Sequence, residues 1–453
     1  MSAPQTARLA DIRPCLEGAI PGVAATADAD GTPNVAYVSQ VFYVDEDHVA
    51  LSFQFFNKTR RNILANPQVT VLVVHPHTAA FYRLHLRYLH TVTDGPVFEA
   101  MKAQLAGIAS HSGMGGIFRL QGSDIYRVEQ LEAVAGRQLT APPPRSAVLA
   151  ALRRGSQALS RSHSLEELLA TALETMCAVC CTEHAMVLMC DPVTQHLYTM
   201  ASCGYATSGL GSEIAPGEGV IGVAAEQRTP VRIGYMTTAD LYQRAVRTRW
   251  RHDDPLHTPD TEIPFPGLRE PHSQLAVPIL CGDRVLGALF VESEHELRFD
   301  HEQEDMLVTL AGQLGAALQL MRDSSAPRDE ADPPAGAAPR RRQGNAALRI
   351  KRYPPHNSVF IDDSYLIKGV AGAIFWKLVN DHVQHGRCEF SNRELRLDPA
   401  IGLPELTDNL EARLLLLQRR LAEHPSAIRI ERTGRGRFRL IVPQRLELLD
   451  QAG

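Results

Sequence analysis

The chain has 453 residues, of which 44% are hydrophobic and 21% charged, so it has the composition of a soluble globular protein and the length of about three domains. The net charge of -5 argues against a general nucleic-acid coat protein. The charge is unevenly spread, however. Residues 347–453 contain 17 Lys and Arg against 13 Asp and Glu, whereas the remainder contains 29 against 38. The C-terminal part is therefore the basic end of an acidic protein.

The cysteines and the apolar segments bear on where the protein works. Eight cysteines, five of them between Cys177 and Cys203, do not form the pattern of a secreted disulfide framework. The first residues lack the layout of a signal peptide, and the longest weakly polar run, residues 306–321, is shorter than the ~20 residues needed to cross a bilayer. We therefore expect a cytoplasmic protein with reduced thiols and no membrane partner.

Two stretches have the composition of linkers and divide the chain. Residues 135–147 include three consecutive prolines, and residues 323–346 mix Pro, Ala and charged residues that cannot bury a core. We predict domains at 1–140, 146–322 and 347–453, joined by linkers at 141–145 and 323–346.

The first segment is predicted to be rich in strands. Residues 32–56 carry β-branched and aromatic residues around a turn at 45–47, and residues 82–93 alternate apolar and polar side chains. Between them, "NKTRRNILANP" at 57–67 predicts a short helix and "QVTVLVVHP" a strand; a helix at 96–108 and a last strand at 123–134 follow. Antiparallel strands with few helices indicate a small barrel.

The order of strand, "NKTRRNILANPQVTVLV" and strand resembles the flavin-binding split barrel of the pyridoxamine-phosphate oxidase group, over residues 10–135. The resemblance implies bound FMN, whose phosphate would be held by Lys58, Thr59, Arg60 and Arg61 where the short helix opens. A helix N-terminus adds free N–H groups and partial positive charge there. Ser39 and Gln40 would lie near the isoalloxazine ring.

Other ligands remain open for this barrel. Members of the superfamily hold haem or F420 instead, and a barrel without any cofactor is a further alternative. Histidines for a haem are present at His75, His77, His85 and His90, although lone histidines on strands are more often structural. The vitamin-oxidase activity itself is not expected, because that enzyme's full substrate-binding arginine and histidine pattern is missing.

The middle segment begins with predicted helices at 146–161 and 164–180, followed by strands at 184–191 and 196–204. With "APGEGVIGVAAEQRTPVRI" and the strands and helix of 273–319, these pieces resemble a GAF sensory domain over about 170 residues. The resemblance implies a pocket for a small molecule, covered by the long polar segment 234–267. The motif "GEGVIG" matches a dinucleotide fingerprint, but a Pro-Gly turn rather than a strand precedes it, so we interpret it as a fold-specific turn.

The cysteines of this segment offer C-x-x-C spacing at Cys177 and Cys180, with Cys181, Cys190 and Cys203 nearby. A zinc or iron–sulfur site needs four converging ligands, and a second such pair is missing. Three of the cysteines fall on an apolar predicted helix, where buried, unreactive thiols are the usual finding. A redox or metal role is the less favoured alternative, and we predict no metal site.

The C-terminal segment is predicted as strands at 348–367, helices at 369–386 and 391–399, a long helix at 404–425 and a basic hairpin at 427–442. On the long helix, Leu410, Leu414, Leu417 and Leu421 form one apolar stripe. Arg413 and Arg420 lie on another face, which Leu416 interrupts. In the hairpin, apolar residues alternate with arginines around Gly434 and Gly436.

This order is similar to the winged-helix effector domains of response-regulator transcription factors. The resemblance implies that the long helix enters the DNA major groove and that the hairpin, as the wing, meets the backbone or minor groove. Candidate groove contacts are Arg413, Arg419 and Arg420, and candidate wing contacts are Arg435 and Arg437. The acids Asp408 and Glu411 and the missing receiver domain depart from the family. A protein-docking module is the alternative.

The sequence thus favours a multidomain α+β protein with a split β-barrel, a GAF α/β sandwich and a C-terminal winged helix-turn-helix. Its predicted function is that of a one-component transcription regulator that senses a small ligand, flavin, haem or redox input and binds promoter DNA. By analogy with GAF sensors, a homodimer would form through helices 146–161 and 303–321. The alternative is a flavin-dependent oxidoreductase with regulatory GAF and docking domains, and a third is a signalling scaffold.

Overall fold

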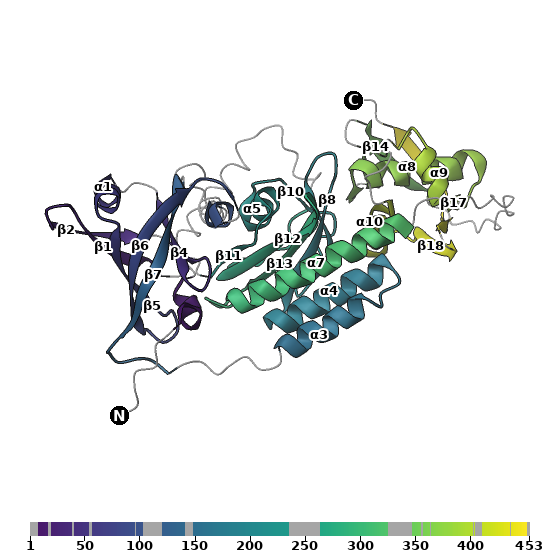
Figure 1. Ribbon diagram of the computed structural model, residues 1–453. Helices are drawn as coiled ribbons and strands as arrows, with labels where there is room; N and C mark the ends of the chain where they lie inside the picture. Colours follow the sequence, from purple (N-terminus) through teal and green to yellow (C-terminus); the bar gives the residue numbers. More distant parts are fainter. Residues whose placement is uncertain are drawn as a thin grey trace.

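The computed structural model places three parts one after another along an elongated molecule (Figure 1). It describes residues 8–16, 20–38, 40–53, 57–95, 97–102, 120–140, 148–234, 263–324, 347–354, 357–362, 364–401, 403, 410–434 and 436–450. Most of the segment predicted to cover the GAF pocket, 234–267, therefore lies outside the described residues.

The N-terminal part is a curled antiparallel sheet of seven strands in the order β2-β1-β5-β6-β7-β4-β3. Inward and outward positions alternate along β5, so that Val69, Val71 and Val73 enter the core beside η1. The prediction of an antiparallel half-barrel with a short helix is confirmed. Its elements are η1 Leu9–Leu16, β1 Gly22–Ala27, β2 Pro33–Val38, β3 Val41–Tyr43, β4 His48–Phe53, α1 Asn57–Ala65, β5 Gln68–Val74, β6 Phe81–Val92 and β7 Gly122–Val134.

The middle part is a six-stranded antiparallel sheet, in the order β10-β9-β8-β13-β12-β11, with helices on both faces. Alternate residues of β8 face opposite sides: Val187 packs toward helices α4 and α7, and Leu188 toward α5. Ser164 caps α4 by accepting a hydrogen bond from the Glu167 amide. The elements are α3 Val148–Leu159, α4 Leu165–Cys180, β8 His184–Cys190, β9 Leu197–Cys203, β10 Glu213–Ile214, α5 Gly219–Gln227, β11 Val231–Ile233, β12 Ser273–Cys281, β13 Arg284–Ser293 and α7 His301–Ser324.

The described residues of the C-terminal part form two small sheets and the helices α8, α9 and α10. One sheet has the order β16-β15-β14-β20, in which β14 and β20 are parallel, and the other has the order β17-β19-β18. The predicted long helix is described from Leu410 onward, so Asp408 lies outside the described residues. The elements are β14 Leu348–Tyr353, β15 Ser358–Ile361, β16 Ser364–Ile367, α8 Gly369–His385, β17 Glu389–Ser391, α9 Asn392–Leu397, α10 Leu410–Glu423, β18 Arg429–Gly434, β19 Arg437–Ile441 and β20 Leu446–Asp450.

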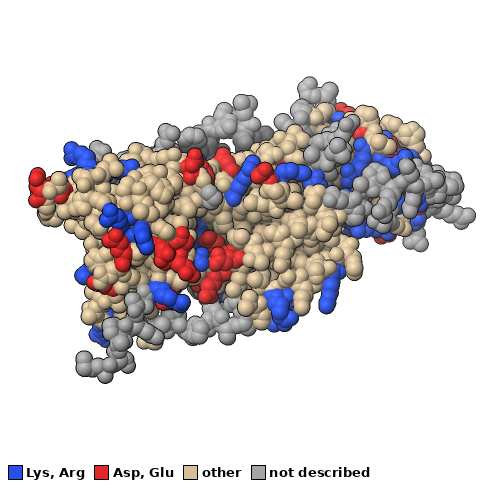
Figure 2. Space-filling model, viewed as in Figure 1, with Lys and Arg blue, Asp and Glu red and all other residues tan. Residues whose placement is uncertain are grey.

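The three parts differ in how they meet. Arg13 of η1 pairs with Asp305 of α7 at 3.2 Å, which links the barrel to the middle domain. The middle and C-terminal parts, in contrast, share one continuous cluster of buried apolar side chains. On the face shown in Figure 2, acidic side chains gather near the junction of the barrel and the middle domain, and basic side chains lie toward the C-terminal part.

Two searches of the described residues gave negative results. None of their helices is long and apolar enough to span a lipid bilayer. None of their His, Cys, Asp and Glu side chains gather in groups of three or more that could hold a metal ion.

Candidate functional site

Helix α1 presents its predicted phosphate ligands in two different ways. Arg60 points inward: its guanidinium pairs with Asp124, donates to the Thr91 hydroxyl at 2.8 Å and stacks over the Phe53 ring. Thr59 is buried and accepts a hydrogen bond from the Asn34 side chain at 2.9 Å. These contacts fasten α1 to the sheet, and they use the groups that the resemblance assigned to a flavin phosphate.

Lys58 and Arg61 occupy the outer side of the same helix. Both are exposed, and neither forms an ion pair with another described residue. Residues three apart on a helix are neighbours on its surface, so the two cations share one face. Of the predicted ring neighbours, Gln40 is buried, whereas Ser39 lies outside the described residues. Of the four predicted phosphate ligands, Lys58 and Arg61 are therefore exposed, whereas Arg60 and Thr59 contact the sheet; phosphate binding stays a prediction.

The histidines considered for a haem do not converge. His75 and His77 lie in the turn after β5 with ring centroids 6.0 Å apart, and burial lowers the pKa of His75. His85 lies beside Glu132 on the sheet, 3.6 Å from its carboxylate. His90 lies five residues further along the same strand, β6, and the described His, Cys, Asp and Glu side chains form no group of three or more that could hold a metal ion.

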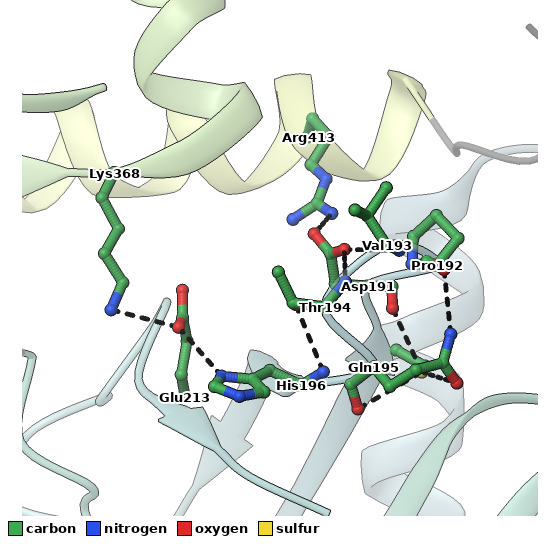
Figure 3. A network of polar contacts seen from close by, with 10 residues as sticks. Asp191, Pro192, Val193, Thr194, Gln195, His196, Glu213, Lys368 and Arg413 are labelled. Atoms are coloured by element: carbon green, nitrogen blue, oxygen red, sulfur yellow. Dashed lines mark hydrogen bonds and ion pairs between the residues drawn. The ribbon is translucent and has the colours of Figure 1, made fainter. Parts of the chain in front are cut away.

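The second region of interest is the contact between α10 and the middle domain, drawn in Figure 3. Its centre is the turn 191–195 between β8 and β9, which we call the Asp191 turn. The Asp191 carboxylate accepts hydrogen bonds from the amides of Val193 and Thr194, at 2.8 and 2.9 Å, and pairs with the Arg413 guanidinium of α10. The backbone of the turn thus holds the carboxylate in place before Arg413 reaches it.

Arg413 is only 6% exposed, and its guanidinium also lies over the Tyr198 ring, 4.3 Å from the centroid. Burial alone would raise the pKa of Asp191, but the amide hydrogen bonds and the charge of Arg413 hold it below its usual value. A lowered pKa means that the contact stabilises the docked arrangement above the ordinary carboxyl pKa of about 3.9 and is lost only as pH falls through the lower value. The pair is therefore fully charged at neutral pH.

Two further polar contacts flank this ion pair. Arg419 Nη1 donates to the Met200 carbonyl of β9 at 2.7 Å, and burial lowers the pKa of Arg419. Lys368, which precedes α8, lies 3.1 Å from Glu213 of β10, and the His196 ring lies 3.5 Å from the same carboxylate oxygen. Cations of the C-terminal part thus face acceptors of the middle domain along the whole contact.

Apolar packing accompanies these polar contacts. The predicted stripe of Leu410, Leu414, Leu417 and Leu421 is buried, as expected, but Leu415 and Leu416 on other faces of α10 are buried as well. A Cβ placed on Gly211 would lie 3.8 Å from a Leu416 methyl group, which puts Leu416 against the loop before β10. Because it is covered on several sides, α10 behaves as a core helix.

The predicted DNA-contact residues therefore lie in unlike surroundings. Arg413 and Arg419 do not face solvent but contact the middle domain, and Arg420 donates to the Leu366 carbonyl at 3.1 Å and pairs with Glu423. All three candidate groove contacts therefore bond within the chain in this arrangement, and their contact with DNA stays a prediction. The sequence contained one indication that this face is covered, because the apolar Leu416 lies on the helix face that carries the arginines.

The hairpin of β18 and β19 is confirmed, with Ile430 opposite Leu440. Ile430, Phe438 and Leu440 are buried, while Arg432 and Arg437 are exposed. Arg435, the other predicted wing contact, lies outside the described residues. Between hairpin, α10 and the start of α4 lies a cavity of about 290 Å³, which Arg432, Arg437 and Glu411 help to line.

The middle domain contains two features that sequence reasoning missed. A cavity of about 510 Å³ lies at one end of its sheet, next to the Asp191 turn; Pro192, Gln195, Arg228, Arg284 and Arg322 are among its lining residues. Inside the sheet, Glu292 is almost fully buried and accepts hydrogen bonds from the Leu268 amide and the Gln274 side chain, at 2.8 and 3.1 Å. Burial raises the pKa of Glu292.

The thiols also differ from expectation. Cys180 is buried, as predicted, but Cys181 is exposed and Cys177 is half-buried, with its sulfur 3.2 Å from that of Cys203. The motif "GEGVIG" spans the turn after the two-residue strand β10 and the start of helix α5. The strands on either side, β10 and β11, pair antiparallel with β9 and β12, so the motif is not in the parallel βαβ unit of a dinucleotide site. Helix α4 thus places cysteines in three environments.

Comparison with known proteins assigns the first two parts. Residues 9–149 match the family model of pyridoxamine 5'-phosphate oxidase, and residues 164–318 match that of the GAF domain. The chain contains a pyridoxamine-phosphate-oxidase-like domain and a GAF domain. No curated protein matches the chain.

Solved structures resemble single parts of the chain. An FMN-binding protein from Syntrophomonas wolfei is 15% identical, with 28% of this chain and 86% of that chain covered and a TM-score of 0.25. The GAF domain of an Acinetobacter phosphoenolpyruvate-protein phosphotransferase is 22% identical, with 40% and 97% covered and a TM-score of 0.32. Free methionine-R-sulfoxide reductase from Neisseria meningitidis is 18% identical, with 41% and 96% covered and a TM-score of 0.31.

The exposed cations of α1 can be tested for phosphate binding. Changing Lys58 and Arg61 to Ala should weaken FMN binding by the full-length protein by about tenfold or more, because charge-assisted contacts to the phosphate are lost. Flavin fluorescence quenching measures the affinity. Arg83→Ala, which removes an exposed arginine of β6, should leave it unchanged. Equal affinity in the α1 variant would contradict this site.

The ion pair across the domain contact can be tested with a double-mutant cycle. Asp191→Asn and Arg413→Gln should each destabilise the protein, and the cycle should show a coupling energy of roughly 0.5 to 3 kcal/mol, as for buried contacting residues. Denaturant unfolding measures it. The exposed pair Glu389 and Arg439 serves as the control and should show no measurable coupling. Additive effects of the first pair would argue against docking in solution.

Proposed function

We propose that this protein is a one-component, signal-responsive transcription regulator whose GAF domain holds helix α10 away from DNA until a signal releases it. The observation that carries the proposal is that two arginines of α10, the buried Arg413 and the half-buried Arg419, bond to acceptors of the GAF domain. Guanidinium groups suited to DNA thus have an alternative partner within the same chain. The described arrangement corresponds to the DNA-free state.

The C-terminal part supports a DNA-binding role through the order of its elements. Helices α8, α9 and α10 precede the β18–β19 hairpin, which is the order of a winged helix-turn-helix, and the hairpin turns its apolar residues inward. Exposed Arg432 and Arg437 then give the hairpin a cationic outer side. Such a hairpin contacts phosphates, while base reading requires α10.

The GAF domain supplies a route from ligand to helix. The 510 Å³ cavity is lined by Pro192 and Gln195 of the Asp191 turn, and Asp191 itself holds Arg413. The Asp191 turn can have one conformation when α10 is docked and another when α10 is released. A small molecule that binds the cavity more tightly in one of these conformations shifts the equilibrium toward that state. Three arginines, Arg228, Arg284 and Arg322, and two acids, Glu226 and Asp283, line this cavity, so it suits a polar ligand.

The barrel provides a second input. FMN held through Lys58 and Arg61 would supply redox chemistry. The oxidation state of the flavin would then follow the redox state of the cell. The protein's own residues would bind the phosphate and, through Gln40, contact the ring side of the ligand. In this proposal the barrel senses rather than catalyses.

A homodimer would place two such C-terminal parts on one DNA site. The helices proposed for the dimer contact carry exposed apolar side chains, namely Leu149 on α3 and Val308 and Leu320 on α7. Burying them between two copies would remove apolar surface from water. Dimerisation through α3 and α7 leaves the C-terminal parts free to bind half-sites.

The wing is tested by changing Arg435 and Arg437 to Ala. The full-length variant should bind duplex DNA from its own promoter more weakly, and the slope of log K against log salt should fall by about 1 for each lost phosphate contact. Fluorescence anisotropy at several salt concentrations measures both. Unchanged affinity and slope in a folded variant would rule out the wing assignment.

The release of α10 is tested with Asp191→Asn. Removing this charge should raise the affinity for the same promoter duplex by roughly tenfold, because the released form becomes more populated. Glu294→Gln, which removes one negative charge from an exposed position just after β13 of the GAF domain, controls for the change in net charge. If both variants bind alike, the GAF domain does not mask α10.

A further inference from the structure

Two cysteines that are 26 positions apart in the sequence meet at one corner of the GAF domain. Cys177 lies in the last turn of α4, and Cys203 is the last residue of β9. Their sulfur atoms are 3.2 Å apart and both are reduced. A disulfide bond of about 2.05 Å needs a further approach of only about 1 Å. The pair is therefore poised to be oxidised with little movement of the backbone.

The local structure explains why the two thiols stay together. Cys203 pairs with Ala185 of β8 in the sheet, and the carbonyl of Cys177 accepts hydrogen bonds from the amides of Cys181 and Thr182 where the helix ends. Behind them lies the buried core that joins α4 to the sheet. Both sulfurs are thus fixed by elements of regular structure, yet both residues remain partly exposed to solvent.

We propose that Cys177 and Cys203 form a redox-active dithiol that a hydroperoxide oxidises to a disulfide. This inference goes beyond the proposed DNA-binding role and does not depend on it. It also differs from the C-x-x-C spacing seen in the sequence, because the partner of Cys177 is Cys203 and not Cys180. Cys180 is fully buried and lies in the core.

The two sulfurs have different roles in this reaction. A hydrogen bond from the Cys177 thiol lowers the pKa of Cys203 to about 7, whereas the pKa of Cys177 is raised by the same contact and by burial. In the proposed reaction Cys203 acts as the thiolate nucleophile and Cys177 as the resolving thiol, and single Cys→Ser variants decide between this order and its reverse. The nearby Glu183 adds to the cost of a thiolate on Cys177.

The hydroperoxide oxidises the dithiol in two steps. The Cys203 thiolate attacks the outer oxygen of the hydroperoxide; an S–O bond forms, the O–O bond breaks, and the alkoxide takes up a proton to leave as alcohol. Cys177 then attacks the sulfenic sulfur; the S–S bond forms, the S–O bond breaks, and the hydroxide leaves as water with the Cys177 proton. Two thiols are oxidised and one hydroperoxide is reduced. Reduction by an external dithiol reverses the change.

The test treats the reduced full-length protein with hydrogen peroxide, blocks remaining thiols with iodoacetamide and maps the peptides by mass spectrometry. We expect labelling of Cys177 and Cys203 to fall together, by about tenfold or more relative to Cys281, and a peptide linking the two to appear. Dithiothreitol should restore both labels. This measurement needs neither a variant nor DNA, so its outcome does not depend on whether the protein binds DNA.

Variants then assign the roles. Cys177→Ser should leave a sulfenic acid on Cys203 that dimedone traps, whereas Cys203→Ser should leave Cys177 unmodified. Cys181→Ser, which removes the exposed neighbouring thiol, should not change the cross-link. If both thiols stay labelled while Cys181 alone is oxidised, or if the cross-link joins Cys177 to Cys181, the dithiol is not the one proposed.

Discussion

The arrangement of the GAF and C-terminal parts depends on the buried contact between Arg413 and Asp191. A buried guanidinium must be paired, since an uncompensated charge in the interior is strongly destabilising. The Asp191 turn meets this need with a carboxylate that two backbone amides already hold in place. Leu416 and the aromatic ring of Tyr198 complete the surroundings. Without this pair, α10 would leave a charge and apolar surface with no suitable partner.

In the proposed function the same contact acts as a two-state element. Helix α10 is apolar on more than one side, so it is stable when docked, but its arginines can also serve a polyanion. Two alternative partners for one surface create an equilibrium that a ligand can shift only by its differential affinity for the two states. The cavity beside the Asp191 turn lies where such a difference would act most directly.

Potential inputs lie at separate places in the molecule. Exposed Lys58 and Arg61 mark the barrel, the cavity at the sheet end marks one side of the GAF domain, and the Cys177–Cys203 pair marks the corner where α4 ends. Strand β9 runs from the dithiol to the α10 contact, because Cys203 ends the strand and the Met200 carbonyl within it accepts a hydrogen bond from Arg419. A change at the dithiol therefore has a short structural path to α10.

The sequence by itself predicted most of the described helices and strands and a small antiparallel barrel, because hydrophobic periodicity and turn residues act over a few neighbouring positions. The GAF domain was predicted from the resemblance of its motifs and their order. The sequence also indicated the buried leucine stripe of α10 and the inward and outward sides of the final hairpin. Only the tertiary structure decided which side chains meet: Arg413 and Asp191 are 222 positions apart, and the partner of Cys177 lies on a strand rather than in its own motif. Likewise, "NKTRR" predicted a cationic helix start, but packing against Asp124 and Asn34 decided which of its residues remain exposed. Periodicity shows that a helix has a second face, whereas the element that covers that face depends on how the domains dock.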